Sequence, residues 1–318
     1  MGGLRMNARA ARIADALATD PERYGVSVHT LANGARVIDA GVEARGGLAA
    51  GRALAEICMG GLGTVEFAGV ALGELWAPGV TVTTDHPAES CMASQYAGWK
   101  IDPEGYFAMG SGPLRAHARV ERELYATLGY EETAERGVLV LEARQLPDEA
   151  VAEYVAGRAN LAPDRLTFVV APTASVAGGV QISARVLETA LHKMLELGFD
   201  VRTIESGLGT APLAPVAKDD LHAIGRTNDG VLYGGRCHFT VRADDAALAE
   251  LVPKVPSAAS SDYGRPFIEI FRRYGGDFYK IDPHLFSPAE VHLTNARTGR
   301  TFSAGRVNPE VLRASWTS

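Results

Sequence analysis

The stretch VVAPTASVAGGVQISARVLETALHKMLELGF, residues 169–199, decides the fold. Its apolar start predicts a buried strand that ends at Val170, and Pro172 and Gly178-Gly179 then predict a loop. A long helix should follow and continue to about Leu197, where Gly198 ends it. A buried strand, a glycine-bearing loop and a helix in this order indicate a protein that combines sheet and helix.

The predicted helix has two faces of different polarity. Residues at helical spacing that should face the core are Ser183, Leu187, Ala190, Leu191 and Met194. Steps of four, three and four residues build a polar stripe of Gln181, Arg185, Glu188 and His192. By pattern alone, a solvated face with an intrahelical ion pair is the commoner interpretation. The position of the stripe after a glycine loop at the end of a strand favours a site instead.

The rest of the chain predicts an α+β protein. A hairpin is expected within residues 26–40, where Asn33-Gly34 supplies the turn. Further helical patterns cover residues 7–17, 46–59, 113–128, 147–159 and 265–274. Strand patterns cover residues 80–84, 137–141, 166–170, 230–241 and 290–294. Because alternation of strands and helices is combined with hairpin signals, mixed sheets are expected.

Length and composition narrow the class of protein. The 318 residues exceed the usual size of one domain, and we place a boundary in the polar segment 143–148, which gives domains 1–145 and 146–318. A net charge of −7 argues against a nucleic-acid-binding surface. The apolar runs are too short for a membrane helix, and no signal peptide or lipidation motif begins the chain. We expect a soluble, cytoplasmic protein.

Residue types that often carry chemistry show no metal or nucleophile pattern. Cys58, Cys91 and Cys237 are far apart and are expected to be reduced thiols in the core. The histidines lack the spacing of a metal site, so no metal is expected. Neither Ser90 nor Ser111 lies in a G-x-S-x-G arrangement, so covalent catalysis has no sequence support.

Glycine clusters could form ligand-binding loops. They occur at GGLGTVEFAG (60–69), ESGLGTAPLAP (205–215) and LYGGRCHF (232–239). Such loops bring the backbone close to a ligand or present N–H groups to phosphate, although tight turns are the commoner explanation of each cluster. None matches a P-loop or a dinucleotide-binding motif, so a nucleotide cofactor is unsupported.

Several stretches together resemble the methenyltetrahydromethanopterin cyclohydrolases of methanogens and methylotrophic bacteria. These stretches are ANGARVIDAG (32–41), AGRALAEICMGGLG (50–63), SQYAGWKI (94–101), residues 169–200, residues 205–235 and GGDFYKIDPHLFSPAEV (275–291). They follow the family order over nearly the full length. Long collinear motifs of this kind are far more specific than the spacing arguments above.

The resemblance implies a fold, an assembly and a reaction. Family members have two α+β domains side by side with the pterin pocket between them, form homotrimers and use no metal or organic cofactor. Their substrate is 5,10-methenyltetrahydromethanopterin or its dephospho form, and their product is the N5-formyl derivative. The reaction belongs to one-carbon metabolism, in methanogenesis and in the formaldehyde oxidation of methylotrophy.

The resemblance also implies site residues. In the motif A-R-x-x-E-T-A-L-H-K, the family's catalytic Arg and Glu match Arg185 and Glu188. Several archaeal members have a lysine where this chain has Tyr96, so Tyr96 should contact the pterin by stacking or through its hydroxyl. The other residues expected to bind the substrate are Gln181, Gly178, Gly179, Gly207, Gly209 and Thr210.

Two other functions remain open at this point. The glycine loops could hold the phosphate of a nucleotide-metabolising enzyme, although no phosphate motif is present. A pterin-binding protein that lost activity is the second alternative, since a fold does not fix a function. The presence of both Arg185 and Glu188 favours an active enzyme.

Overall fold

The computed structural model describes residues 3–277 and 280–317, and positions 278 and 279 of the 275–291 stretch lie outside them. The chain divides into two compact units. Unit 1 combines residues 1–64 with 89–181, and unit 2 combines residues 65–88 with 182–318. Residues 146–181, which we placed in the second domain, group with unit 1.

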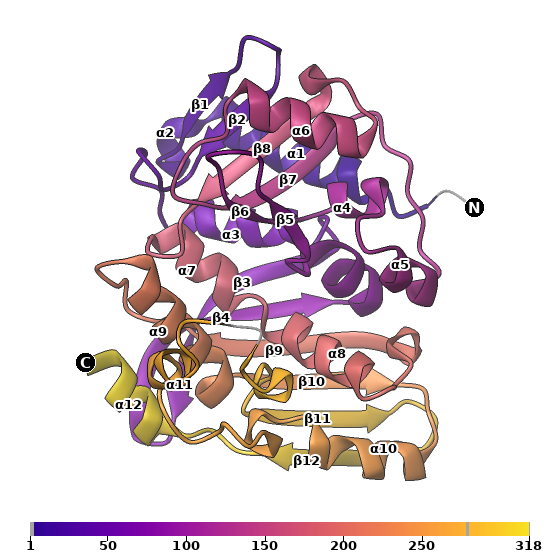
Figure 1. Ribbon diagram of the computed structural model, residues 1–318. Coiled ribbons are helices and arrows are strands. Elements are labelled where there is room, and N and C mark those ends of the chain that lie inside the picture. The colour runs from indigo at the N-terminus through magenta and orange to yellow at the C-terminus, as the bar shows by residue number, and fades with distance from the viewer. Residues whose placement is uncertain (1–2, 278–279, 318) are drawn as a thin grey trace. The chain divides into compact units, whose positions relative to one another are not determined.

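Unit 1 contains a six-stranded mixed sheet in the order β1-β2-β8-β7-β6-β5 (Figure 1). Strands β2, β8 and β7 are parallel, and the remaining pairs are antiparallel. The Asn33-Gly34 hairpin is confirmed, with Gly34 at φ 88° between β1 and β2. The strands are β1 (Ser27–Thr30), β2 (Arg36–Asp39), β5 (Trp99–Ile101), β6 (Ala108–Ser111), β7 (Gly137–Glu142) and β8 (Leu166–Ala171).

Helices cover both faces of this sheet. Helices α1 and α3 pack on one face through Leu17 and Leu54, and α6 packs on the other through Val155. Strand β8 is buried along its whole length because it has apolar neighbours on both faces. The helical segments of this part are α1 (Met6–Thr19), α2 (Pro21–Tyr24), α3 (Leu48–Cys58), the π-helix η1 (Ala88–Gln95), α4 (Leu114–Ala118), α5 (Arg122–Leu128), α6 (Glu149–Ala159), η2 (Pro163–Arg165) and α7 (Val176–Ser183).

Unit 2 contains the second six-stranded mixed sheet, in the order β12-β11-β10-β9-β4-β3. Strands β10 and β11 are parallel, whereas β9 is antiparallel to both β4 and β10. With two mixed sheets and helices, the predicted α+β class is confirmed. The strands are β3 (Gly63–Leu72), β4 (Leu75–Thr84), β9 (Ile204–Pro212), β10 (Arg236–Val241), β11 (Glu290–Asn295) and β12 (Thr301–Gly305).

One apolar cluster joins the helices of unit 2 to the β3–β4 end of its sheet. Tyr233, Phe267 and Leu312, from α9, α11 and α12, meet Val70 and Leu72 of β3. The helical segments are α8 (Val186–Glu196), η3 (Val201–Thr203), α9 (Asp220–Gly234), α10 (Asp245–Leu251), η4 (Val252–Lys254), η5 (Ser257–Ala259), α11 (Phe267–Arg273), η7 (Pro283–Leu285) and α12 (Pro309–Thr317).

Two predicted helices are wrong in length because the backbone breaks inside them. The helix expected over residues 113–128 is two helices, since Arg119 takes a left-handed conformation (φ 50°) and ends α4. The long helix expected as far as Leu197 is also two helices, α7 and α8, separated at Ala184 and Arg185. Helical periodicity continues across both breaks, so local pattern does not predict them.

Three glycine-rich segments were assigned to the wrong element. Residues 230–234 belong to α9 rather than to a strand, because their apolar side chains pack in the cluster around Tyr233. The clusters at 60–69 and 205–215 were interpreted as loops, but most of their residues form β3 and β9. Tertiary packing overrides the local preference of these residues.

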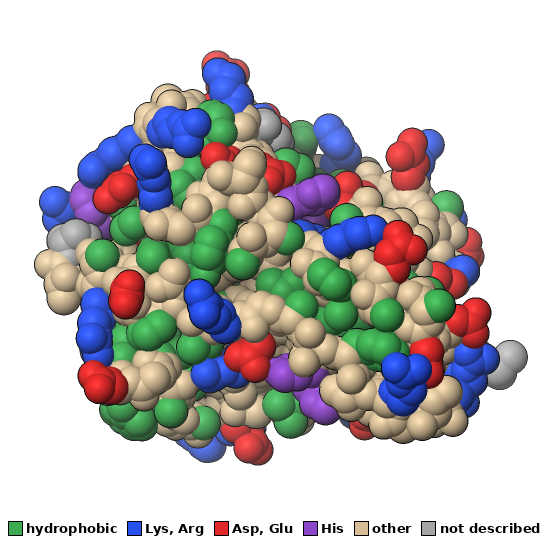
Figure 2. Space-filling view, turned by 90° about the horizontal axis from the view of Figure 1, so that it is seen from below, with side chains coloured by type: hydrophobic (Ala, Val, Ile, Leu, Met, Phe, Trp, Pro, Cys, Tyr) green, Lys and Arg blue, Asp and Glu red, His purple; other side chains and the backbone are tan. Residues whose placement is uncertain are grey.

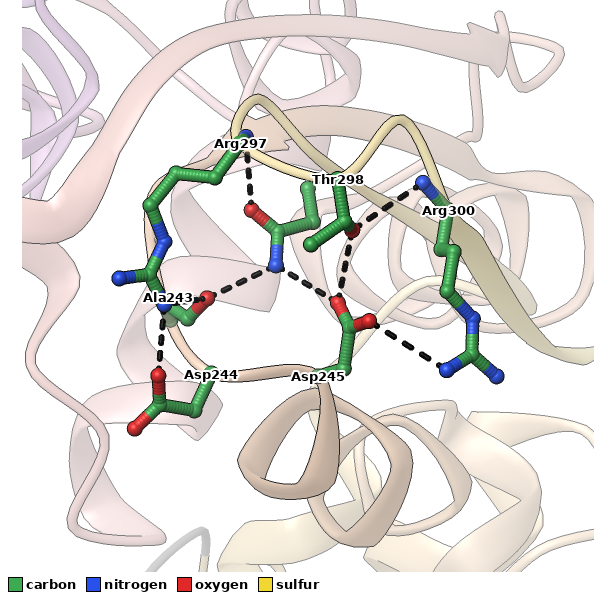
Figure 3. A network of polar contacts seen from close by, with 7 residues as sticks. Ala243, Asp244, Asp245, Arg297, Thr298 and Arg300 are labelled. Atoms are coloured by element: carbon green, nitrogen blue, oxygen red, sulfur yellow. Dashed lines mark hydrogen bonds and ion pairs between the residues drawn. The ribbon is translucent and has the colours of Figure 1, made fainter.

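A polar network fixes the turn between β11 and β12 to the start of α10 (Figure 3). The buried amide of Asn295 donates to the Ala243 carbonyl at 2.8 Å and to Asp245 at 2.7 Å. Arg300 adds an ion pair with Asp245 at 3.3 Å. The hydrogen bond from Asn295 therefore helps to lower the pKa of the Asp245 carboxyl below its usual value.

Acidic and basic side chains are interspersed on the face shown in Figure 2, with apolar side chains between them. Cys58, Cys91 and Cys237 are buried, as predicted. In the described part of the chain, none of the helices has the length and apolar character needed to cross a bilayer. Across residues 3–277 and 280–317, no three His, Cys, Asp or Glu side chains gather closely enough to hold a metal ion.

Asp229 is a buried carboxyl that joins two helices of unit 2. It lies on α9, is fully buried, and accepts a hydrogen bond from the Phe267 N–H at the start of α11 at 2.8 Å. Burial raises the pKa of Asp229 to about 7, against a hydrogen bond from Ser315 that acts in the opposite direction.

We predict that Asp229 makes the stability of the protein fall as the pH rises from about 4 to 7. In this range the unfolded chain loses the Asp229 proton while the folded protein keeps it. The free energy of unfolding therefore falls by about 1.4 kcal/mol for each pH unit. Chemical denaturation of the wild type and Asp229→Asn at several pH values measures this effect. The difference in unfolding free energy between wild type and variant should shift with this slope, and parallel curves would contradict the assignment.

Candidate active site

The break between α7 and α8 sets the geometry of the candidate site. Arg185 is the residue before α8 and has φ −81° and ψ 5°, outside the ideal helical range. On either side of it, the Ser183 hydroxyl donates to the Pro212 carbonyl at 3.3 Å and the Cys237 thiol donates to the Val186 carbonyl at 3.1 Å. These contacts attach the break to strands β9 and β10.

Arg185 and Glu188 are buried together. Their exposed fractions are 8 % and 5 %, and Arg185 Nη1 lies 4.0 Å from Glu188 Oε2. Gln181 is also buried, at 3 % exposure, whereas the His192 side chain is 28 % exposed and lies 3.9 Å from Glu196. The interpretation of the polar stripe as a solvated face is therefore wrong for its first three residues.

The position of Glu188 on α8 favours a negative charge. Glu188 is in the first turn of the helix, where the peptide dipoles present their positive end. The Arg185 guanidinium adds a formal positive charge within one turn. A carboxylate this deeply buried requires such compensation, because desolvation of an isolated charge is expensive.

Gly207 and Gly209 are in the middle of the sheet rather than in a loop. They pair with β4 on one side and β10 on the other. A Cβ on Gly209 would lie 2.7 Å from Val186 Cγ1, and one on Gly207 would lie 3.3 Å from Leu187 Cδ1. Both glycines therefore let the first turn of α8, which carries Glu188, approach the sheet closely.

Thr210 is on the other face of the sheet. Side chains alternate along a strand, so Thr210 and Gly209 point in opposite directions. Gly209 faces Val186 and Leu187 of α8. The structure therefore does not bring the Thr210 side chain to the Arg185–Glu188 pair.

Gly178 and Gly179 are also not in a loop, because both belong to α7. The Ser175 hydroxyl caps the N-terminus of this helix, because it accepts a hydrogen bond from the Gly178 N–H at 3.0 Å. A Cβ on Gly178 would collide with the Pro172 carbonyl, whereas no described atom lies within 4 Å of the Cβ position of Gly179. Gly178 thus allows close packing, and Gly179 borders open space.

Tyr96 directly follows the π-helix η1 and is half-buried in unit 1. Its N–H donates to the Cys91 carbonyl at 2.8 Å, five residues back, which continues the π-helical pattern. The Arg115 guanidinium lies over its ring, 5.2 Å from the centroid. Sequence reasoning found neither the π-helix nor Arg115, because local residue preferences distinguish neither a π-helix nor a buried arginine.

Lys193 is a second residue that sequence reasoning missed. It is on α8 and almost completely buried, and its ammonium group donates to the carbonyls of Pro256 at 2.9 Å and His284 at 2.5 Å. Burial lowers the pKa of Lys193 to about 8. These two hydrogen bonds anchor the last turn of α8 to Pro256, which follows η4, and to His284 of η7.

A family model described as "Cyclohydrolase (MCH)" matches residues 5–316. The chain belongs to the methenyltetrahydromethanopterin cyclohydrolase family. The family resemblance derived from the sequence motifs is thereby confirmed.

Curated members of this family are similar to the chain over almost its whole length, and each bears the name methenyltetrahydromethanopterin cyclohydrolase. The protein of Methylobacterium organophilum is 48 % identical over 98 % of this chain and 97 % of its own. That of Methanosarcina barkeri is 46 % identical over 93 % of this chain and 92 % of its own. That of Methanospirillum hungatei is 44 % identical over 98 % of this chain and 99 % of its own. Cyclohydrolases of a methylotroph genus and of methanogens thus align with the same two units.

We predict that Gly209→Ala destabilises this cyclohydrolase by about 1–3 kcal/mol, because the added methyl group overpacks the contact with Val186. Gly157→Ala is the matched control, since no described atom lies near its Cβ position in α6. Alanine at this helical position should stabilise the protein by about 0.5–1 kcal/mol. Thermal and chemical denaturation of both variants measures the effects. Equal changes in the two variants would rule out close packing as the reason for Gly209.

Proposed function

We propose that the chain hydrolyses 5,10-methenyltetrahydromethanopterin, or a close relative of it, to the N5-formyl derivative, with Glu188 as the base that activates water. The names of the relatives, all methenyltetrahydromethanopterin cyclohydrolases, support the substrate and the reaction class. The single observation that carries the role of Glu188 is its burial beside Arg185 at the start of α8. A buried, charge-compensated carboxylate is the kind of group that accepts a proton during catalysis.

The proposed reaction needs one proton acceptor and no redox step. The bridging carbon between N5 and N10 is an amidinium-like cation and is already electrophilic. Water adds to this carbon while its proton passes to Glu188, which gives a neutral carbinolamine. Glu188 then returns the proton to N10, the carbon–N10 bond breaks, and the hydroxyl proton leaves to solvent as the formyl group forms. One proton is released in total.

Arg185 has an electrostatic role in this proposal. An arginine that faced the cationic substrate alone would repel it. At 4.0 Å from Glu188, the guanidinium charge is directed at the carboxylate, which it holds in the ionised form and in a fixed orientation. Because the substrate carbon is already cationic, the proposal includes no metal and no organic cofactor.

The contacts that hold the pterin are a further part of the proposal. We assign direct contacts to Tyr96, Gln181 and Gly179, which are a half-buried ring, a buried amide and a glycine that borders open space. Gly178 allows α7 to pack closely against the Pro172 carbonyl. Contacts from the remaining predicted residues stay predictions, as do a homotrimeric assembly and a cytoplasmic location. These predicted contact residues are Gly207, Gly209 and Thr210.

We predict that Glu188→Gln folds like the wild type but loses turnover by about 100- to 10,000-fold, because glutamine accepts no proton. Glu196→Gln, in the exposed last turn of the same helix, is the matched control and should keep its activity. Loss of the methenyl chromophore, followed against boiled enzyme, measures the rates. Near wild-type turnover in Glu188→Gln would remove Glu188 from the mechanism.

We predict that Arg185→Ala lowers kcat and moves the acid limb of the pH–rate profile to higher pH, because an uncompensated buried carboxylate holds its proton more strongly. Arg185→Lys should shift the limb less, since it retains a positive charge. Arg202→Ala is the control, because Arg202 is exposed and pairs with the exposed Asp200 at the surface. A lower rate with an unchanged pH profile would instead assign Arg185 to substrate binding.

A further inference from the structure

We propose that Arg115 is a positioning residue that holds the Tyr96 ring in the orientation in which it receives the pterin. This inference rests on the proposed function, in which Tyr96 contacts the substrate. Arg115 is on α4, nineteen positions beyond Tyr96, and none of the sequence motifs includes it. Its own contacts are with protein groups of unit 1, so it acts through Tyr96 rather than on the reacting atoms.

The segment before Tyr96 is held through the backbone carbonyls at the end of η1. A π-helix leaves carbonyl groups at its end without partners inside the helix. Here three successive carbonyls each accept a bond from another element. Tyr125 donates to Ala93 at 3.0 Å, Arg115 donates to Ser94 at 3.1 Å, and Ser111 donates to Gln95 at 2.6 Å. The Ser94 carbonyl also accepts from the Gly112 N–H at 2.8 Å, so Arg115 and Gly112 together fix the backbone two residues before Tyr96.

The Arg115 guanidinium also fixes the Tyr96 side chain. It lies over the ring at 5.2 Å, within the range of a cation–π interaction. Glu121 holds the edge of the guanidinium. Its carboxylate accepts a hydrogen bond from Arg115 Nε at 3.1 Å and lies 2.8 Å from Arg115 Nη2. Because the planar group is held from two sides, its position over the ring is defined.

Gly98, two residues after Tyr96, leaves room for this arrangement. A Cβ on Gly98 would collide with a Glu121 carboxylate oxygen and would lie 2.8 Å from Tyr96 Cε1. Any larger residue at position 98 would therefore separate the ring from the carboxylate that holds Arg115. The end of η1 before Tyr96 and Gly98 after it thus both lie against groups that hold the Arg115 guanidinium or are held by it.

The burial of Arg115 is costly for a group that only supports a loop. The side chain has no exposed surface, and Arg is rarely buried unless it is paired and hydrogen-bonded. A neutral donor could satisfy one carbonyl at lower cost. A guanidinium combines the hydrogen bond to Ser94 with a flat cation that can lie on an aromatic ring. This combination explains why an arginine is placed behind Tyr96.

The test is a double-mutant cycle on KM for the methenyl substrate, with Arg115→Lys, Tyr96→Ala and the double variant. Arg115→Lys keeps the charge but loses the planar fork, and we expect KM to rise about tenfold with kcat nearly unchanged. In the Tyr96→Ala background, the same replacement should add no further increase. Arg119→Lys, at the exposed end of α4 and paired with Glu131, is the matched control and should leave KM unchanged.

Each outcome of the cycle has one meaning. An unchanged KM in Arg115→Lys, or an equal increase in the wild-type and Tyr96→Ala backgrounds, would overturn the positioning role. If Arg115→Lys does not fold, Glu121→Gln replaces it in the cycle, because it releases the guanidinium without removing it. A wild-type protein without cyclohydrolase turnover would refute the proposed function itself, before any variant is compared.

Discussion

A buried carboxylate on the first turn of α8 is the constraint on which the structure of unit 2 depends. Glu188 is buried beside Arg185, on a helix that lies very close to the sheet. This closeness requires glycine at position 209, directly under Val186, and leaves little room for a Cβ at position 207, beside Phe239 and Leu187. The helix that packs on these glycines is the one that carries the Arg185–Glu188 pair.

The sequence predicts much of this architecture, for identifiable reasons. The strand predicted at 166–170, the Asn33-Gly34 hairpin and the apolar side of α8 follow from periodicity and turn chemistry, and the structure has all three. The break at Arg185 and the strand containing Gly209 could not be predicted, because both are imposed by neighbours that are distant in sequence. Local pattern also favoured a solvated stripe, since it contains no information about what lies against a polar face.

The candidate site residues separate into two kinds. The proposed catalytic pair, Arg185 and Glu188, and the proposed substrate contact Tyr96 were identified through family motifs. Arg115 and Lys193 are outside such reasoning because their importance is three-dimensional. Arg115 is buried against the Tyr96 ring, and Lys193 binds α8 to the Pro256 and His284 carbonyls. In both cases a buried cation donates to backbone carbonyls and fixes an element that carries a candidate site residue.

The most direct test of the account is a crystal structure of the inactive Glu188→Gln variant with the methenyl substrate bound. The account predicts that the glutamine side chain contacts a water molecule at about 3 Å, and that this water faces the methenyl carbon. It also predicts that the Arg185 guanidinium points to position 188 rather than to the cationic ring system. A methenyl carbon that lies far from residue 188, with no water between them, would contradict the central claim.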